Sequence, residues 1–196
     1  MRNPYQASHP ISDPNDFFGR KTECQLLYEM LLSGESVNIT GPRRIGKSSL
    51  LKVLPTPEMQ KNIFGEEVFK QYEAFASVNL QNAAQQTPFQ VFSKIGEQLR
   101  ANGLEINAPD SYANFEAMLK TFTEQKIRLI VLIDEFDAVT QNTEFNETFF
   151  NTLRAYQQDF LVSYFIASVK SVKEIADHIK NVSPFFNIFR YLPLSL

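Results

Sequence analysis

The segment GPRRIGKSS, at residues 41–49 of this 196-residue chain, constrains the fold more than any other feature. It fits the pattern G-x-x-x-x-G-K-[ST], and a chance match in a chain of this length has odds on the order of one in a hundred. The stretch ESVNIT before it alternates Val37 and Ile39 with polar residues, as a strand does, and SLLKVL after it begins a helix. A loop with this pattern between a strand and a helix is predicted to wrap a phosphate chain.

Each position of this loop has a chemical reason. Gly41 and Gly46 let the backbone fold closely around phosphates with its N–H groups pointing inward. We expect Lys47 to reach the β- and γ-phosphates and the Ser48 hydroxyl to ligate Mg²⁺. Ser49 either contacts the region of the α-phosphate or caps the turn. The other loop residues expected at the nucleotide are Pro42, Arg43, Arg44 and Ile45.

A second part of the site is predicted at the end of RLIVLIDEFD, residues 128–137, whose almost wholly apolar start is typical of a parallel strand covered on both faces. Asp134 would hold Mg²⁺, and Glu135 would orient and polarise an attacking water. With Lys47, these two residues form the predicted catalytic set. The Asp-Glu pair favours hydrolysis and argues against a small-molecule kinase, which would transfer the phosphate to a small acceptor. For Asp137 we expect a cap on the next turn.

Two further patterns refine the site. The strand-like segment FLVSYFIAS ends in Ser168, which either contacts the γ-phosphate or the attacking water, as a fourth catalytic residue, or lies on the surface and caps the next helix. Guanine specificity usually needs an Asn-Lys-x-Asp tetrapeptide, which this sequence lacks. Adenine is therefore the favoured base, and ATP with Mg²⁺ is the predicted ligand.

Segments with the hydrophobic spacing of strands alternate along the chain with segments that have the spacing of helices. This alternation predicts a parallel α/β sheet with helices on both faces. Helices are expected from Thr22 to Gly34, with Thr22 and Gln25 as a capping box, and after the loop as far as Pro55 or Pro57. Further helices are expected from Thr87 to Gly103, around 112–122, over 144–158 and after a Ser171–Glu174 cap. Strands are expected at 35–40, 72–80, 128–135, 160–168 and near the C-terminus.

Composition limits the class of protein. Hydrophobic residues make up 43% and the net charge is −3, which indicates a globular chain and argues against a surface built wholly for nucleic acid. The single cysteine, Cys24, excludes an internal disulfide. The longest aliphatic run, LIVLI, is too short to span a bilayer, and the polar N-terminus has no signal-like apolar region, so a cytoplasmic location without membrane contact is predicted. The 18 Phe residues either fill the core or cover a surface for a partner.

Five segments together resemble the AAA-like ATPase module of bacterial STAND-type signalling NTPases, which are relatives of the archaeal ATPase and origin-initiator branches of the AAA+ class. The segments are DFFGRKTE (16–23), GPRRIGKSSLL (41–51), LIVLIDEFD (129–137), FIASVK (165–170) and SPFFNIF (183–189). The resemblance runs from Pro10 to Leu194. With the alternation above, it implies a three-layer P-loop NTPase fold with a five-stranded parallel sheet in the order 5-1-4-3-2.

The resemblance also assigns roles to individual residues. Phe18, Gly19 and Arg20 match an element that lies over the adenine and ribose, so residues 1–20 would form an arm and adenine-side flap, and residues 21–196 the ATPase core. Ser168 matches the polar first-sensor position. Arg190 stands near the place of an arginine that reaches a neighbour's γ-phosphate, with an ordinary surface arginine as the alternative.

Members of this family normally continue past the last strand into a helical lid, whereas this sequence stops at Leu196. Either the chain is a fragment of a longer protein, which we favour, or the lid is absent. Without a lid the site would be open to water on one side, which predicts slow ATP turnover. The apolar tail would also be partly exposed, which predicts self-association or packing against further domains. The implied function is a slow ATP-hydrolysing, nucleotide-dependent switch that cycles between ATP and ADP. The alternative is a DNA-associated, initiator-like AAA+ module.

Overall fold

The computed structural model describes residues 9–64, 73–178 and 185–195. Within these ranges, parallel strands form a five-stranded sheet in the order β2-β3-β4-β1-β5, which is the predicted order read from the other edge. The predicted fold class is thus confirmed. The strands are β1 (Ser36–Thr40), β2 (Glu73–Asn79), β3 (Arg128–Asp134), β4 (Val162–Ser168) and β5 (Phe189–Pro193).

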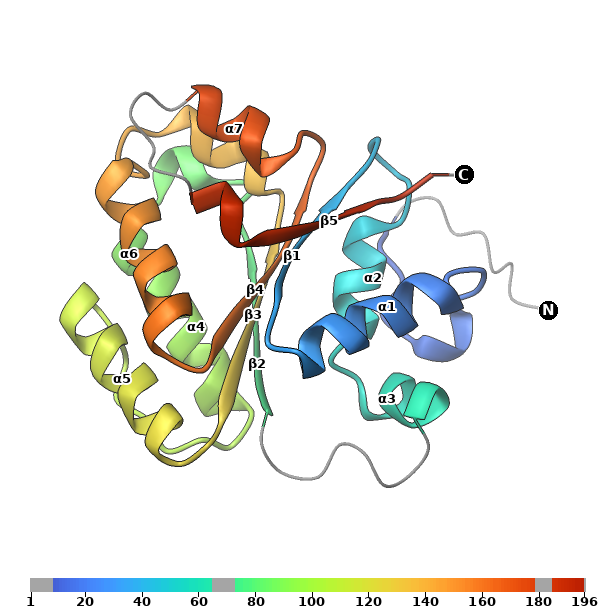
Figure 1. Ribbon diagram of the computed structural model, residues 1–196, viewed down its shortest axis with the longest axis horizontal. Coiled ribbons are helices and arrows are strands. Elements are labelled where there is room, and N and C mark those ends of the chain that lie inside the picture. Colours follow the sequence, from blue (N-terminus) through green and yellow to red (C-terminus); the bar gives the residue numbers. More distant parts are fainter. Residues whose placement is uncertain (1–8, 65–72, 179–184, 196) are drawn as a thin grey trace.

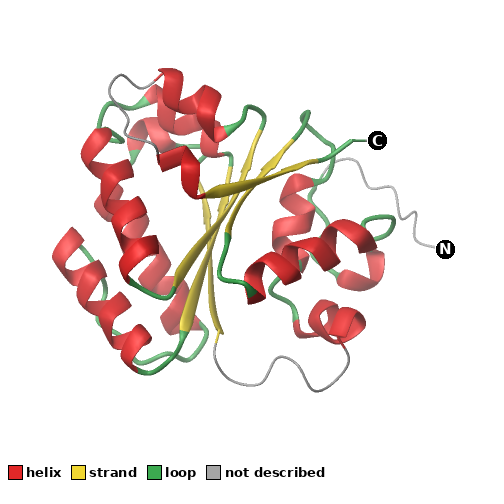
Figure 2. Ribbon diagram, viewed as in Figure 1, coloured by secondary structure: helices red, strands yellow, loops and turns green. Residues whose placement is uncertain are grey.

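Helices cover both faces of the sheet and give three layers (Figure 1). One outer layer consists of α1 (Lys21–Leu32), α2 (Lys47–Val53) and α3 (Pro57–Phe64). The other consists of α4 (Pro88–Ala101), α5 (Tyr112–Glu124), α6 (Glu147–Asp159) and α7 (Val172–His178). Figure 2 shows the same sandwich, with the strands between two groups of helices. Short 3₁₀ turns lie at Pro14–Asp16 (η1), Ala83–Gln85 (η2), Phe136–Gln141 (η3) and Phe185–Ile188 (η4).

Local sequence signals set most helix starts. Thr87 and Gln90 form the complete capping box of α4, and Ser171 and Glu174 bond reciprocally at the start of α7, as predicted. The capping box predicted at Thr22 is wrong, because α1 already begins at Lys21 and has no side-chain cap. Pro57 does not end a helix but begins α3, since proline at the first helical position loses no hydrogen bond.

The polar residues of β1 are buried, although the alternation suggested a strand with one polar side. Ser36 and Asn38 are both fully buried. Because helices cover both faces of the sheet, the second face of the strand also lies in the interior, and its polar groups need partners there. The Ser36 hydroxyl accepts the Tyr164 N–H at 3.0 Å. Asn38 bonds to Ser168 at the end of β4 and to the N–H of Val172 at the start of α7.

Most of the apolar tail belongs to the core, so the prediction of a partly exposed tail is wrong for four of its described residues, whereas Phe186 is half-buried. Phe185, Phe189, Leu192 and Leu194 are each at most 8% exposed. β5 lies beside β1. Phe189 packs into the core on one face of the sheet, and Leu192 and Leu194 pack into the core on the other. Leu196 lies outside the described residues. Most phenylalanines also fill the core, in a cluster of ring contacts that includes Phe92, Phe115, Phe136, Phe149, Phe150 and Phe185.

Candidate functional site

The carboxyl ends of the parallel strands bring the predicted site residues to one edge of the sheet. The loop at 41–46 follows β1, and Asp134 ends β3. β4 lies between these two strands, and its last residue, Ser168, is paired with Thr40. Ligand sites of open α/β sheets lie at this edge, so the topology places both halves of the predicted site where a ligand would bind.

The backbone of the loop needs its two glycines. Gly41 has a φ of +153°, and a Cβ there would lie 2.8 Å from the carbonyl oxygen of Leu194. Gly46 has a φ of +105°, which side-chain-bearing residues rarely adopt. The loop is therefore shaped by glycine at both ends and packs against the end of β5.

Lys47 lies at the centre of the site. Its ammonium donates to the carbonyl oxygens of Gly41 at 2.7 Å and Pro42 at 2.9 Å, and the residue is 9% exposed. Burial lowers the pKa of Lys47, while the negative charges of Glu135, Asp137 and Asp134 oppose this lowering. The acidic end of β3 thus acts electrostatically on the loop lysine, as the predicted site requires.

Glu135 has an unusual backbone for a residue with a side chain. Its φ of 54° and ψ of 42° are left-handed, and its N–H donates to Asp134 Oδ1 at 3.0 Å. Left-handed non-glycine residues cost of order 1–3 kcal/mol and cluster at functional sites. This turn lies between the end of β3 at Asp134 and the start of η3 at Phe136. It therefore sets the position of the acidic pair at the end of the strand.

Ser168 lies in a buried network, and the surface-cap alternative is therefore wrong. The residue is 1% exposed. Its hydroxyl accepts from Asn38 Nδ2 at 2.7 Å and donates to the carbonyl of Lys170 at 2.6 Å. Contact of Ser168 with a γ-phosphate stays a prediction. Asn38 was missed by the sequence analysis, although a polar residue in a central strand of a covered sheet could have indicated it.

The Asp137 side chain bonds to the segment after β4 and not to the turn that follows it, so the prediction that it caps the next turn is also wrong. Its carboxylate accepts the backbone N–H groups of Val169 at 2.6 Å and Lys170 at 3.0 Å, which follow β4. The carboxylate therefore joins the end of β3 to the end of β4.

The described part of the arm contacts the loop and its helix. Arg20 pairs with Glu23 at 2.6 Å and donates to the carbonyls of Ile45 at 3.3 Å and Ser195 at 2.7 Å. The Ile11 N–H donates to the Ser49 hydroxyl at 2.9 Å, so Ser49 contacts the arm, and its contact with the region of the α-phosphate stays a prediction. Residues 1–8 of the predicted arm lie outside the described residues. Phe18 and Gly19 are exposed, and their contact with adenine stays a prediction.

Arg190 lies away from the loop within its own chain. It is part of β5, where it is paired with Val37, and its guanidinium bonds to Glu35 at 3.1 Å. That position is near the amino end of β1, whereas the loop follows the carboxyl end. A role toward a neighbouring subunit stays a prediction.

The oxygen donors at the site fit Mg²⁺. The Ser48 hydroxyl lies in the first turn of α2, and the Asp134 carboxylate ends β3. Mg²⁺ is usually held by one or two such protein oxygens together with substrate phosphates. In the described residues there is no group of three or more His, Cys, Asp or Glu that could hold a metal without such a ligand.

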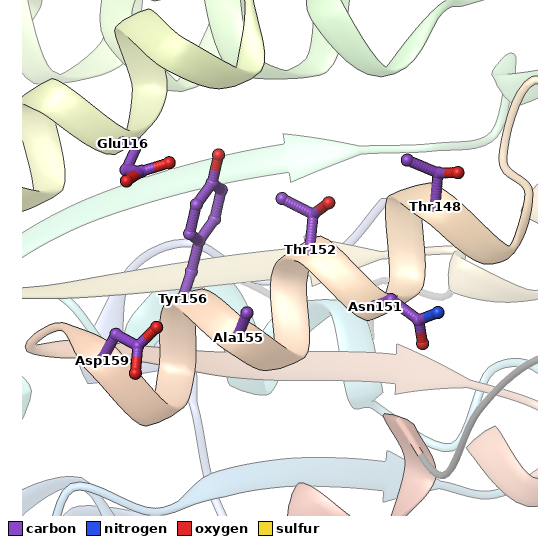
Figure 3. Close-up of a pocket in the computed structure, with 7 residues that line it drawn as sticks. All are labelled: Glu116, Thr148, Asn151, Thr152, Ala155, Tyr156 and Asp159. Atoms are coloured by element: carbon purple, nitrogen blue, oxygen red, sulfur yellow. The ribbon is translucent and has the colours of Figure 1, made fainter.

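A groove of about 460 Å³ lies elsewhere, along α6 and opposite Glu116 of α5 (Figure 3). Most of the residues that line it are polar, and none belongs to the loop or to the acidic pair. The lining residues are Glu116, Thr148, Asn151, Thr152, Ala155, Tyr156 and Asp159. The predicted site therefore lies at the carboxyl edge of the sheet and not in this groove.

In the part of the chain that the structure describes, no helix has the length and apolar character needed to cross a membrane.

Solved structures share the fold at low sequence identity. The Aeropyrum pernix ORC2 protein, solved with ADPNP and ADP, is 18% identical, with a TM-score of 0.70 over 98% of this chain and 51% of that one. The Walker-type ATPase of Pyrococcus abyssi is 15% identical, with a TM-score of 0.66 over 95% of this chain and 56% of that one. Drosophila ORC bound to DNA is 13% identical, with a TM-score of 0.61 over 91% of this chain and 43% of that one. The chain thus spans about half the length of the first two structures, or less in the third.

Among curated proteins, none matches the chain at a significant level. The family model for novel STAND NTPase 2, in contrast, matches residues 30–195. This range holds the phosphate loop, the acidic pair and all strands of the described sheet. The chain therefore belongs to the novel STAND NTPase 2 family and is a P-loop NTPase module.

Proposed function

We propose that this chain binds ATP with Mg²⁺ at residues 41–49 and hydrolyses it slowly, as a nucleotide-dependent switch. The proposal rests on the buried Lys47 ammonium, which donates hydrogen bonds to two carbonyls of the loop. The negative charges of Glu135, Asp137 and Asp134 act on this ammonium. Adenine is favoured because the sequence has no Asn-Lys-x-Asp base reader.

Binding rests on Lys47 and the loop backbone. In the structure, the ammonium bonds to two neutral carbonyls. Phosphate oxygens would replace these neutral acceptors with negatively charged ones, which attract the ammonium more strongly. Ser48 and Asp134 would hold Mg²⁺. When bound, this ion neutralises the charge that develops on the phosphates.

Hydrolysis rests on Glu135. Its carboxylate would orient a water and accept a proton from it, and its backbone turn ties it to Asp134 through one hydrogen bond. Ser168, at the neighbouring strand end, would contact the γ-phosphate or that water. Ser168 ends β4, and Glu135 directly follows the end of β3, which is paired with β4 as far as Ile133 and Ile166.

Switching is supported by Arg20. Its guanidinium bonds at once to the loop carbonyl of Ile45 and to the carbonyl of Ser195, the last described residue. A shift of the loop on phosphate binding would therefore reach the arm and the chain beyond β5. We propose residues 1–20 as an adenine-side flap on a core of residues 21–196, with the exposed Phe18 and Gly19 beside the base.

Calorimetry with Mg²⁺ and ATP tests the binding half. Lys47→Ala should weaken binding at least tenfold, because a hydrogen bond to a charged group contributes about 1.5–3 kcal/mol. Lys52→Ala is the matched control, since Lys52 is exposed at the other end of α2. Equal affinity in the Lys47 variant and the control would overturn the proposal.

Phosphate release without an added acceptor tests the hydrolysis half and separates an ATPase from a small-molecule kinase. The mass of the protein in solution with ATP and with ADP tests the switch. A mass and a hydrodynamic radius that are the same in both states would contradict nucleotide-dependent packing.

A further inference from the structure

The loop between β4 and α7, residues 169–171, is held from the acidic strand. Asp137 Oδ2 accepts the N–H of Val169 at 2.6 Å, and Oδ1 accepts the N–H of Lys170 at 3.0 Å. Asp137 lies in η3, two residues after Glu135. One carboxylate therefore fastens this loop to the segment that carries the proposed water-orienting residue.

The same loop is held a second time from the strand that precedes the phosphate loop. Asn38 Oδ1 accepts the N–H of Val172 at 2.9 Å, and Asn38 Nδ2 donates to Ser168 Oγ at 2.7 Å. The Ser168 hydroxyl then donates to the carbonyl of Lys170 at 2.6 Å. Asn38 is fully buried, two residues before the end of β1. Both halves of the site thus meet in this short loop.

The bonds of Asp137 also limit what the residue can do. Each of its carboxylate oxygens already accepts one backbone N–H, so the carboxylate bridges two consecutive amides of the loop and cannot rotate without losing one of these bonds. Its charge nevertheless acts on Lys47: burial lowers the pKa of that ammonium, and the charge of Asp137, with those of Glu135 and Asp134, opposes this lowering. Asp137 therefore lies close enough to the site for its position to matter.

We propose that Asp137 is a positioning residue for the proposed ATP hydrolysis: it fixes the β4–α7 loop, and with it Ser168, relative to Glu135. This inference rests on the proposed function. Binding depends on the phosphate loop, whereas hydrolysis depends on the relative placement of residues from two strands. A misplacement of about 1 Å can cost roughly a hundredfold in rate. Loss of the two Asp137 bonds should therefore lower the rate and spare the affinity.

Asp137→Asn tests this, because an amide keeps one acceptor oxygen and turns the other into a donor facing an N–H group. The turnover number should fall at least tenfold, while ATP affinity by calorimetry stays within twofold of the wild type. By NMR, the amides of Val169 and Lys170 should exchange faster, with those of β3 unchanged. Asp159→Asn, which removes an exposed charge at the end of α6, should alter none of these.

Asp137→Glu separates position from charge. It keeps the negative charge near Lys47 but moves the carboxylate by one methylene, so it should also lose turnover. A wild-type rate in Asp137→Asn, or a full rate in Asp137→Glu, would overturn the inference. So would parallel losses of affinity, rate and melting temperature, which a purely structural role predicts. A wild-type chain that binds ATP but releases no phosphate would overturn the proposed hydrolysis instead.

Discussion

Glu135 combines a left-handed backbone with a place directly after Asp134. Glu135→Gln should keep ATP affinity within about twofold, because the loop and Asp134 are untouched. Phosphate release in a single turnover should fall roughly 10²–10⁴-fold, the usual contribution of a positioned acid or base. Asp134→Asn should instead weaken the dependence on Mg²⁺. Glu144→Gln, an exposed site, is the control; a wild-type rate in Glu135→Gln would exclude Glu135 as the activating residue.

Ser168 is predicted to matter for stability as well as for catalysis. Its hydroxyl accepts from Asn38 and donates to Lys170 in a buried site. Ser168→Ala should lower the free energy of unfolding by about 1–3 kcal/mol, because it leaves buried polar groups short of a partner. Urea unfolding measures this. Ser33→Ala, at the exposed end of α1, should stay within about 0.5 kcal/mol of the wild type. Equal losses at the two sites would show that the network adds no stability.

At the scale of elements, the arm is expected to decide which base is bound. Deleting residues 1–20 removes the exposed Phe18, the Arg20 bonds and the Ile11 contact with α2. Binding of ATP should weaken, and the preference for ATP over GTP should be lost, since only phosphate contacts remain. Competition calorimetry with the two nucleotides measures both effects.

A point variant controls for damage to the start of α1 in that deletion. Phe18→Ala should weaken ATP about three- to tenfold, which matches an aromatic stacking contribution of about 0.5–1.5 kcal/mol. Phe89→Ala, at an exposed phenylalanine on α4, should leave the affinity unchanged. An unchanged ATP-to-GTP preference in both the deletion and Phe18→Ala would contradict the flap.

At the scale of the whole molecule, Glu73 predicts how stability depends on pH. Burial at the start of β2 raises the pKa of Glu73 to about 7, against the opposing charge of Arg128. Between pH 4.5 and pH 7 the folded chain holds a proton that the unfolded chain releases. The contribution of this group to stability is therefore complete below pH 4.5 and falls as pH rises to about 7.

Melting temperatures across this range check the sign. Glu73→Gln should flatten the fall with pH and make the chain more stable than the wild type above the raised pKa. Glu97→Gln, at an exposed position on α4, should follow the wild type. A wild-type melting temperature that rises steadily over the same range and is matched by Glu73→Gln would contradict the assignment.

Much of the site could be predicted from the sequence because it consists of local patterns. A strand, a glycine-shaped loop and a helix follow one another at residues 36–53, and the acidic pair directly follows a buried strand. Glycine spacing and hydrophobic period encode such segments without reference to the rest of the chain. The order of the strands came from the resemblance and agrees with the sheet.

The tertiary structure alone decided which side chains meet across strands. Asp137 contacts the backbone after β4, Asn38 contacts Ser168, and Arg20 contacts Ser195. These partners are far apart in sequence, and no local pattern marks them. Burial likewise reversed two local interpretations, at β1 and at β5, because helices cover both faces of the sheet. The sequence by itself determined the chemistry of each segment; the strand order and the two helix layers determined its neighbours, since contacts and burial are properties of the packed chain.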